Sequence, residues 1–279
     1  IIKNNNSCGL TKPQSCYSME VISEKKYNSL EYQIYIEGKL SKSYLQVLEE
    51  SNITLNEIII LKNNHTLGSS LLKEKDKYNY DNYFKIKNIN ELLKNSNSQI
   101  YYHNSSDIND PNLLDLISAL KNKYVIFSGG GILKNEILSL NKLFIHIHPG
   151  IIPDYRGSTC FYYSLLNENY LGASAFLMNE DLDAGDIIVQ NKFKLNYFIN
   201  NDQNYFIDYI VDNYIRAQVL RQALKIFWES DNFRTVNKNC TGTANYIMHP
   251  LLRHLTIKKI NQRYNPNEKE GILSLAVEN

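Results

Sequence analysis

Two histidines and one aspartate are the residues whose types and spacing could carry acid–base chemistry in this chain. His146 and His148 lie at the end of the apolar run 143–147, and Asp183 follows in a glycine-containing loop. A histidine oriented by an aspartate can donate and accept protons near neutral pH. The pattern therefore indicates a proton-transfer site built on His148 and Asp183.

Metal binding is an alternative use of the two histidines. His146 and His148 are two residues apart, so an extended strand would place both side chains on one face. Imidazoles arranged in this way hold zinc when further ligands join them. No convincing third ligand stands nearby in the sequence, and we expect no metal.

The turn at 149–157 adds a cation to these residues. Arg156 could orient an anionic substrate group, or it could simply pair with Asp154. A histidine at a strand end is commonly structural, and the acidic loop around Asp183 would look the same on an ordinary surface. What favours a functional site is that His148, Arg156 and Asp183 each come at an expected strand end or in an adjacent loop.

A run of three glycines follows the apolar segment 124–127: Gly129, Gly130 and Gly131. Ligands of open α/β sheets bind at the carboxyl ends of the strands, and glycine lets a flat ligand lie against the bare backbone. A tight turn that needs positive φ would have the same composition. The run matches neither a dinucleotide-binding nor a P-loop pattern, so it gives little support to a phosphate site.

The composition favours a cytoplasmic protein without a nucleic-acid or membrane surface. The net charge is +1, from 30 basic and 29 acidic residues among 279. No apolar stretch approaches the roughly 20 residues that a membrane span requires, and the first residues lack the apolar core of a signal peptide. The cysteines are scattered, which is typical of free thiols in a reducing compartment: they are Cys8, Cys16, Cys160 and Cys240.

Alternating strand and helix patterns position these candidates. Strands are expected at 32–37, 57–61, 100–103, 124–128, 143–147, 173–178 and 187–193, the last two as an antiparallel hairpin at a sheet edge, and helices at 41–50, 110–121, 134–140, 161–166 and 203–228. This succession predicts an α/β fold: a Rossmann-like, mostly parallel twisted sheet with helices on both faces and a small C-terminal appendage. The expected organisation is an N-terminal extension at 1–30, a catalytic domain at 31–230 and the appendage at 231–279.

Two sequence blocks carry a family resemblance. His-Pro-Gly-Ile-Ile-Pro-Asp-Tyr-Arg-Gly at 148–157, followed by Asp-Leu-Asp-Ala-Gly-Asp-Ile-Ile at 181–188, resembles the formyltransferases that use 10-formyltetrahydrofolate. That family shows Asn-x-His-Pro-Ser-Leu-Leu-Pro-x-Tyr-Arg-Gly and then Leu-Asp-x-Gly-x-Ile-Ile/Leu. The similarity extends from Tyr32 to about Phe193.

The resemblance implies a role for each matched position. His148 corresponds to the family's catalytic histidine and Asp183 to its catalytic aspartate, while Arg156 and Tyr155 are expected to bind substrate. The residues expected to contact the folate are Gly129, Gly130, Gly131, Leu182, Ala184 and Gly185.

One position departs from the family pattern. The family's asparagine, two residues before the catalytic histidine, hydrogen-bonds the formyl oxygen, and His146 stands there instead. A histidine can donate one hydrogen bond when neutral and two when protonated. We therefore expect His146 to be a third catalytic residue that replaces the amide donor.

The resemblance implies formyl transfer from 10-formyltetrahydrofolate to a primary amine. By elimination we expect the amine to be a nucleotide-linked amino sugar, whose base stacks on one of the aromatic residues Phe227, Trp228, Phe233 or Tyr246. The alternatives are hydrolysis of 10-formyltetrahydrofolate, formylation of methionyl-tRNA or glycinamide ribonucleotide, and a non-catalytic binding module. The sequence does not determine the oligomeric state, for which a homodimer is one possibility.

Overall fold

A computed structural model describes most of the chain in eleven segments. They are residues 18–24, 39–62, 87, 89–96, 98–105, 107–121, 123–128, 131–199, 206–230, 232–238 and 244–275.

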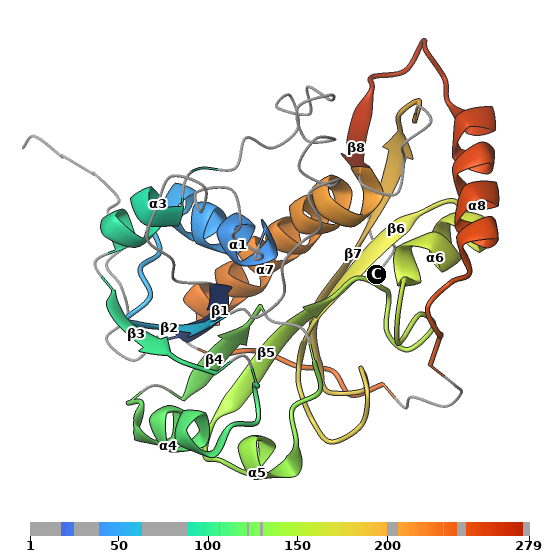
Figure 1. The fold of residues 1–279 in the computed structure, drawn as a ribbon. Helices are drawn as coiled ribbons and strands as arrows, with labels where there is room; N and C mark the ends of the chain where they lie inside the picture. Colours follow the sequence, from blue (N-terminus) through green and yellow to red (C-terminus); the bar gives the residue numbers. More distant parts are fainter. Residues whose placement is uncertain are drawn as a thin grey trace, which may run out of the picture.

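Eight strands form one mixed sheet in the order β3-β2-β1-β4-β5-β6-β7-β8 (Figure 1). Five of them run parallel: β1 (Ser18–Glu24), β2 (Glu57–Lys62), β3 (Gln99–His103), β4 (Tyr124–Phe127) and β5 (Leu143–His148). The other three are antiparallel: β6 (Leu171–Leu177), β7 (Ile187–Asn196) and β8 (Gly271–Ser274). The expected α/β architecture with a mostly parallel sheet is confirmed.

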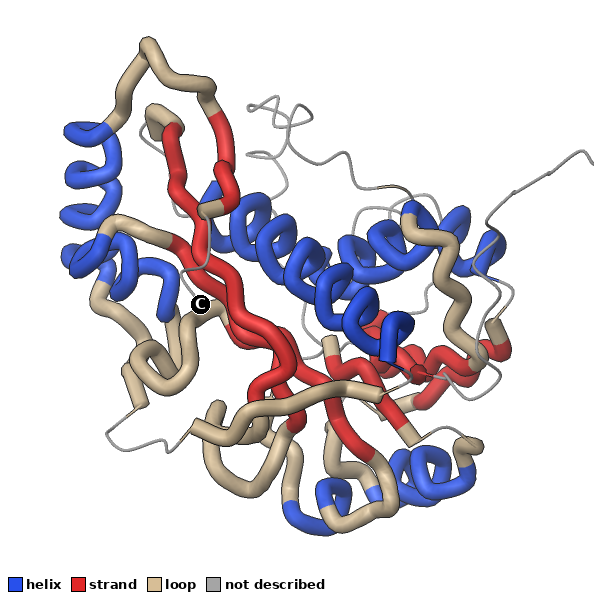
Figure 2. Tube along the Cα trace, turned by 180° about the vertical axis from the view of Figure 1, so that it is seen from behind, coloured by secondary structure: helices blue, strands red, loops and turns tan. Residues whose placement is uncertain are grey.

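Helices cover both faces of the sheet (Figures 1 and 2). One face carries α1 (Lys39–Glu50), α3 (Ile89–Ser96), η3 (Phe206–Val211) and α7 (Asp212–Ser230), and the other carries α4 (Pro111–Ala119) and α5 (Asn135–Leu138). Next to β6 lies α6 (Cys160–Glu168), and α8 (Pro250–Arg263) packs against α6 and β7. The continuously apolar strands are buried on both sides, as the crossovers of a parallel sheet require: Ile58 and Ile60 face α1, whereas Ile59 and Leu61 face α4.

The first strand differs from the expectation. Residues 18–24, assigned above to the N-terminal extension, form β1 in the middle of the sheet, between β2 and β4. The segment Ser18-Met-Glu-Val-Ile-Ser-Glu24 is short and interrupted by acidic and hydroxyl residues, which conceals the strand pattern. The strand expected at 32–37 falls outside the described residues, as do Gly129 and Gly130.

The C-terminal region is built into the same sheet. β8 pairs with β7, so the β6–β7 hairpin is not at the edge, contrary to the expectation. α8 packs against α6. Whether 231–279 acts as a separate appendage remains a prediction. None of the helices in the described segments is both long enough and apolar enough to cross a membrane.

Candidate active site

His148 is the last residue of β5, at the sheet edge where the five parallel strands have their carboxyl ends. Its side chain is almost fully buried, at 3% exposure, and both ring nitrogens face oxygen acceptors. Nδ1 lies 3.4 Å from Oδ2 of Asp183, and Nε2 lies 2.9 Å from the carbonyl of Tyr155. Because a carbonyl only accepts, Nε2 is the nitrogen that carries a proton in the neutral ring.

The contact between His148 and Asp183 can hold one further proton. Burial lowers the pKa of His148, and the Asp183 carboxylate and the Tyr155 carbonyl oppose that shift. With Nε2 donating to Tyr155, Nδ1 and the carboxylate would present only lone pairs to each other. A proton placed between Nδ1 and Oδ2 satisfies both atoms, so the two residues can take up and release a proton as a unit.

The loop after β6 presents Asp183 to this histidine. Asp183 adopts a left-handed backbone conformation with φ of 49°, and Oδ2 accepts a hydrogen bond of 2.9 Å from the amide of Gly157. Gly185 is buried against the end of β6, where any Cβ would overlap the carbonyl of Leu177. Glycine at 185 is therefore required for the loop to close over the sheet.

The turn after β5 supplies the second wall of the site. Ser174 on β6 donates to the carbonyl of Gly150 at 2.6 Å and accepts from the amide of Ile152 at 3.0 Å. The hydroxyl of Tyr155 donates to Glu168 at 2.7 Å, and the ring is buried against Ile151. Tyr155, expected to bind substrate, thus contributes to the site through its carbonyl, since its side chain faces the interior.

His146 lies two residues before His148 on β5 and is partly exposed. Its Nδ1 lies 3.0 Å from the carbonyl of Phe127 on β4. Burial lowers its pKa to about 3, with Arg216 adding to the shift, so the ring is neutral at pH 7. With the proton on Nδ1, a neutral His146 has no donor on Nε2, which the expected amide-like role would need.

Arg216 on α7 lies behind the two histidines and was not anticipated from the sequence. Its Nε donates to the carbonyl of Ile147 at 2.6 Å, and its guanidinium pairs with Asp212 at 3.4 Å. It thereby fixes the backbone between His146 and His148. A cation among the buried residues of an apolar helix face was the signal available in the sequence, because such a charge needs partners.

The segment 232–238, after α7, runs across strands of the sheet and was also missed (Figure 2). Val236 pairs with Ile187 at the end of the Asp183 loop, and Asn237 donates to Asp186 at 2.6 Å. Farther along, Asn245 pairs with Gly157, whose amide binds Asp183. We call 244–248 the strap.

The remaining expected contact residues are distributed around this centre. Arg156 donates to the carbonyl of Leu182 at 3.3 Å, which ties the turn to the Asp183 loop. Leu182 is 50% exposed and Ala184 is half-buried, so the loop offers an apolar surface suited to a flat ligand. Gly131 is exposed, with φ of 105°. Contact of these residues with the folate stays a prediction.

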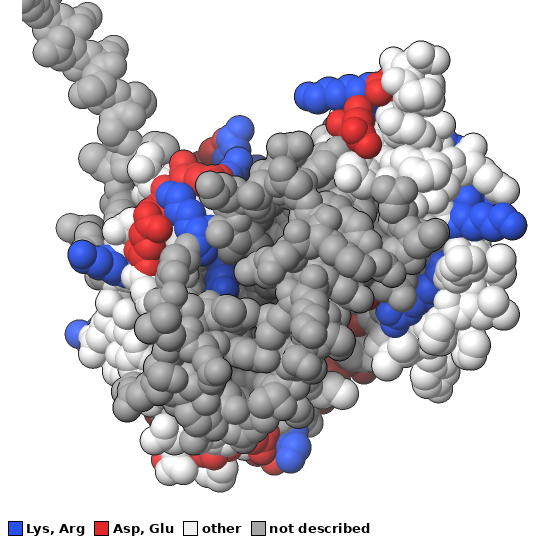
Figure 3. All heavy atoms as spheres, turned by 45° about the horizontal axis from the view of Figure 1, so that its top comes forward, with Lys and Arg blue, Asp and Glu red and all other residues white. Residues whose placement is uncertain are grey.

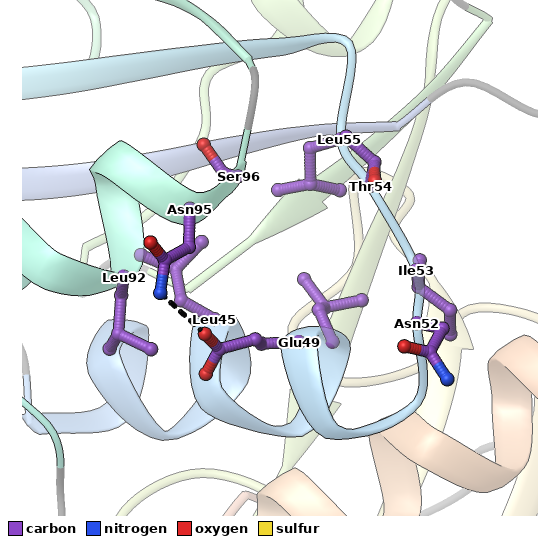
Figure 4. A pocket seen from close by; sticks show the side chains of 10 residues that line it. Leu45, Glu49, Asn52, Ile53, Thr54, Leu55, Leu92, Asn95 and Ser96 are labelled. Carbon is purple, nitrogen blue, oxygen red and sulfur yellow. Dashed lines mark hydrogen bonds between the residues drawn. The ribbon is translucent and has the colours of Figure 1, made fainter.

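A cavity elsewhere on the molecule has different chemistry. About 190 Å³ lie between α1, α3 and the turn after α1, among Leu45, Leu48, Ile53 and Leu92 (Figure 4). Its mouth carries Glu49, which accepts from Asn95 at 2.9 Å. None of the candidate catalytic residues lines it. Within the described segments, no three His, Cys, Asp or Glu side chains are arranged as metal ligands.

Comparison with known proteins identifies the family of the chain. The family model described as formyl transferase matches residues 36–203. A methionyl-tRNA formyltransferase of Finegoldia magna is 37% identical over 93 residues, which cover 32% of this chain and 30% of the relative. One of Clostridioides difficile is 27% identical over 176 residues, covering 61% and 54%. The chain thus spans only about a third to a half of the length of these relatives.

A solved structure shares the fold. The phosphoribosylglycinamide formyltransferase of Anaplasma phagocytophilum aligns with a TM-score of 0.50 and 13% identity, over 84% of this chain and 98% of that one. The family match covers more than half of the chain and includes His146, His148 and Asp183. The chain therefore belongs to the formyl transferase family.

Proposed function

We propose that this chain transfers the formyl group of 10-formyltetrahydrofolate to a primary amine. The observation that carries the proposal is the contact of 3.4 Å between His148 and Asp183 at the carboxyl end of β5, within the region that the family model matches. Formyl transfer to an amine needs a group that removes a proton from the amine and returns it to the leaving nitrogen. The pair is suited to both steps.

The exposure of the two residues decides which of them meets the reactants. The Asp183 side chain is 12% exposed, whereas His148 is 3% exposed and lies behind it. The amine would therefore approach the carboxylate. Its nitrogen forms a bond to the formyl carbon, its proton passes to the space between Oδ2 and Nδ1, and the bond from the formyl carbon to the folate nitrogen breaks as that nitrogen takes the proton.

The strap offers a contact for the rest of the acceptor. Tyr246 is 87% exposed and directly follows Asn245, which pairs with Gly157 beside Asp183. Among the expected aromatic residues, Phe227 and Phe233 are buried. An exposed tyrosine ring is a surface on which a nucleobase stacks. We propose a nucleotide-linked amino sugar as the acceptor, with its base on Tyr246.

Formylation of methionyl-tRNA is the second candidate. Two observations favour it: the curated relatives carry that name, and α8 holds Arg253, Lys258, Lys259 and Arg263 with no acidic residue. Basic side chains accordingly stand at the right of the surface, where α8 lies (Figure 3). Phosphate backbones are bound by such groups.

One experiment separates these possibilities. The protein is incubated with 10-formyltetrahydrofolate and, in separate reactions, a nucleoside-diphosphate amino sugar, glycinamide ribonucleotide, methionyl-tRNA or no amine. Formylated product and tetrahydrofolate are then quantified. We expect product with the amino sugar. Formate release at the same rate in all reactions would instead indicate hydrolysis, and no turnover in any of them would contradict the proposal.

A further inference from the structure

The hydrogen bond of His146 determines whether the side chain at the family's asparagine position can donate or accept a hydrogen bond toward a reactant. Phe127 ends β4 and is the register partner of His146, so its carbonyl points across to the β5 side chain. The distance from this oxygen to Nδ1 is 3.0 Å. A carbonyl has no proton to give, so Nδ1 must donate, and the other nitrogen of the neutral ring carries a lone pair.

Two aromatic rings pack against the imidazole of His146. The Phe127 ring lies 5.7 Å from the imidazole centroid at an interplanar angle of 40°, and the Phe176 ring of β6 lies 5.9 Å away at 88°. Flipping the imidazole by 180° about its Cβ–Cγ bond would place Cδ2 where Nδ1 now lies and would break the bond to Phe127. Among the described residues, no group donates a hydrogen bond to Nε2.

The positive charge of Arg216 also favours the neutral form of His146. Arg216 binds the carbonyl of Ile147, the residue between the two histidines, and its charge disfavours a second proton on either imidazole. Through the strand alternation, His146 shares a face of β5 with His148. His148 in turn contacts Asp183. The end of β5 therefore gathers two hydrogen-bond acceptors: Nε2 of His146 and the Asp183 carboxylate.

We infer that His146 accepts a hydrogen bond from the attacking amine through Nε2, and does not donate to the formyl oxygen. This inference rests on the proposed function. A primary amine has two N–H groups. With one directed to His146 and the other to Asp183, its lone pair is left to attack the formyl carbon. The proton that the amine loses goes to Asp183 and His148, as above, and His146 contributes orientation alone.

The protonation state of His146 tests the polarity directly. We expect long-range ¹H–¹⁵N correlation spectra of histidine-labelled protein at pH 7 to show Nδ1 protonated and Nε2 unprotonated. The signals are assigned by their loss in His146→Asn. If that variant does not fold, contacts between the imidazole and the rings of Phe127 and Phe176 assign them in the wild-type protein. A proton on Nε2, in either a neutral or a charged ring, would overturn the inference.

The rates of formyl transfer to the amine and of hydrolysis by water, compared in one variant, test the role of His146. In His146→Leu, loss of one neutral hydrogen bond should lower the rate of transfer to the amine by about three- to tenfold, with little change in the hydrolysis of 10-formyltetrahydrofolate. His254→Leu, which replaces an exposed histidine of α8, is the matched control and should change neither rate.

The outcomes separate this inference from the proposed function. An equal fall of transfer and hydrolysis in His146→Leu would identify an oxyanion donor, and no change in either would remove His146 from the reaction. Each result contradicts the inference while leaving formyl transfer intact. Absence of transfer by the wild-type chain with every amine tested would overturn both proposals.

Discussion

At the residue scale, Asp183 is the group on which the proposed proton transfer depends. It contacts His148 and accepts from the Gly157 amide with the same oxygen. Asparagine keeps a carbonyl oxygen for Gly157 but cannot hold the shared proton. We expect Asp183→Asn to lower kcat by about 10²- to 10⁴-fold, the range typical of general acid–base groups, with an unchanged melting temperature.

A neighbouring residue provides the control for that measurement. Asp181 is exposed in the same loop, so Asp181→Asn removes the same charge without touching His148. In steady-state kinetics, kcat of Asp183→Asn should lie about 10²- to 10⁴-fold below that of Asp181→Asn. Equal rates for the wild-type protein and Asp183→Asn would show that the pair is structural.

The lowered pKa of His146 makes stability depend on pH. Its folded-state pKa is about 3, against 6.5 for the ordinary side chain. The unfolded chain therefore binds a proton that the folded chain does not as pH falls from about 6.5 towards 3, and stability falls with it. Urea unfolding between pH 7 and pH 4 should show a smaller loss of stability for His146→Asn than for the wild-type protein. Parallel curves would mean that His146 titrates alike in both states.

Tyr246 carries the prediction about the acceptor. If a base stacks on its exposed ring, Tyr246→Ala should raise KM for the nucleotide-linked acceptor by roughly five- to tenfold, as expected from about 1 kcal/mol of aromatic contact, with a nearly unchanged kcat. Phe198→Ala changes another exposed aromatic residue, one that packs against Tyr264, and should leave KM unaltered. An unchanged KM in Tyr246→Ala would exclude stacking at the strap.

At the element scale, the Asp183 loop can close only because Gly185 lacks a side chain. A methyl group there would overlap the carbonyl of Leu177, which belongs to β6. Gly185→Ala should therefore push the loop outward, destabilise the protein by about 1–3 kcal/mol as overpacking does, and reduce activity by separating Asp183 from His148. Glu180→Ala, at an exposed position of the same loop, is the control. Thermal unfolding and kcat of both variants would check this, and a fully active Gly185→Ala would contradict it.

The sequence predicted the elements whose patterns are local. β4 is a continuous apolar run and β5 begins with one. Asp110 followed by Pro111 marks the start of α4, where the Asp110 side chain accepts from the amide of Asn112. β1 escaped because seven mixed residues contain too little alternation, and its place is set by pairing with β2 and β4. Such pairing is a property of the whole sheet.

The same distinction applies to the candidate site. The contact between His148 and Asp183 agrees with the spacing of two sequence blocks. Arg216 reaches the site only because α7 packs under β5, and Asn245 only because the chain returns across the sheet. The bond from His146 to Phe127 depends on the register of β4 and β5. Long-range packing therefore determines two features that the motif alone does not reveal: which nitrogen of His146 donates a hydrogen bond, and which residues hold the loops of the site in place.

At the scale of the whole molecule, the charge distribution bears on the choice of acceptor. The net charge is +1, and the described surface in view intersperses acidic and basic side chains except near α8 (Figure 3). On α8 itself, Arg253 pairs with Asp208 at 3.4 Å, and Arg263 donates to the carbonyl of Leu165 at 3.3 Å. Lys259 also donates to the carbonyl of Leu166 at 3.4 Å, so three of the four basic side chains of α8 already have partners within the protein.

The dependence of KM on salt concentration tests which acceptor the protein uses. Neutralising six to ten phosphates would make tRNA affinity fall by about 10³- to 10⁵-fold between 50 and 200 mM salt. A nucleotide sugar has two phosphates at most to neutralise, and its KM should rise by less than about tenfold over the same range. We expect the weak dependence for the amino-sugar acceptor and no measurable transfer to methionyl-tRNA. A steep rise in KM for methionyl-tRNA, with Lys258→Ala and Lys259→Ala each reducing the slope by about one, would instead establish α8 as a nucleic-acid contact and reverse the order of the two acceptors.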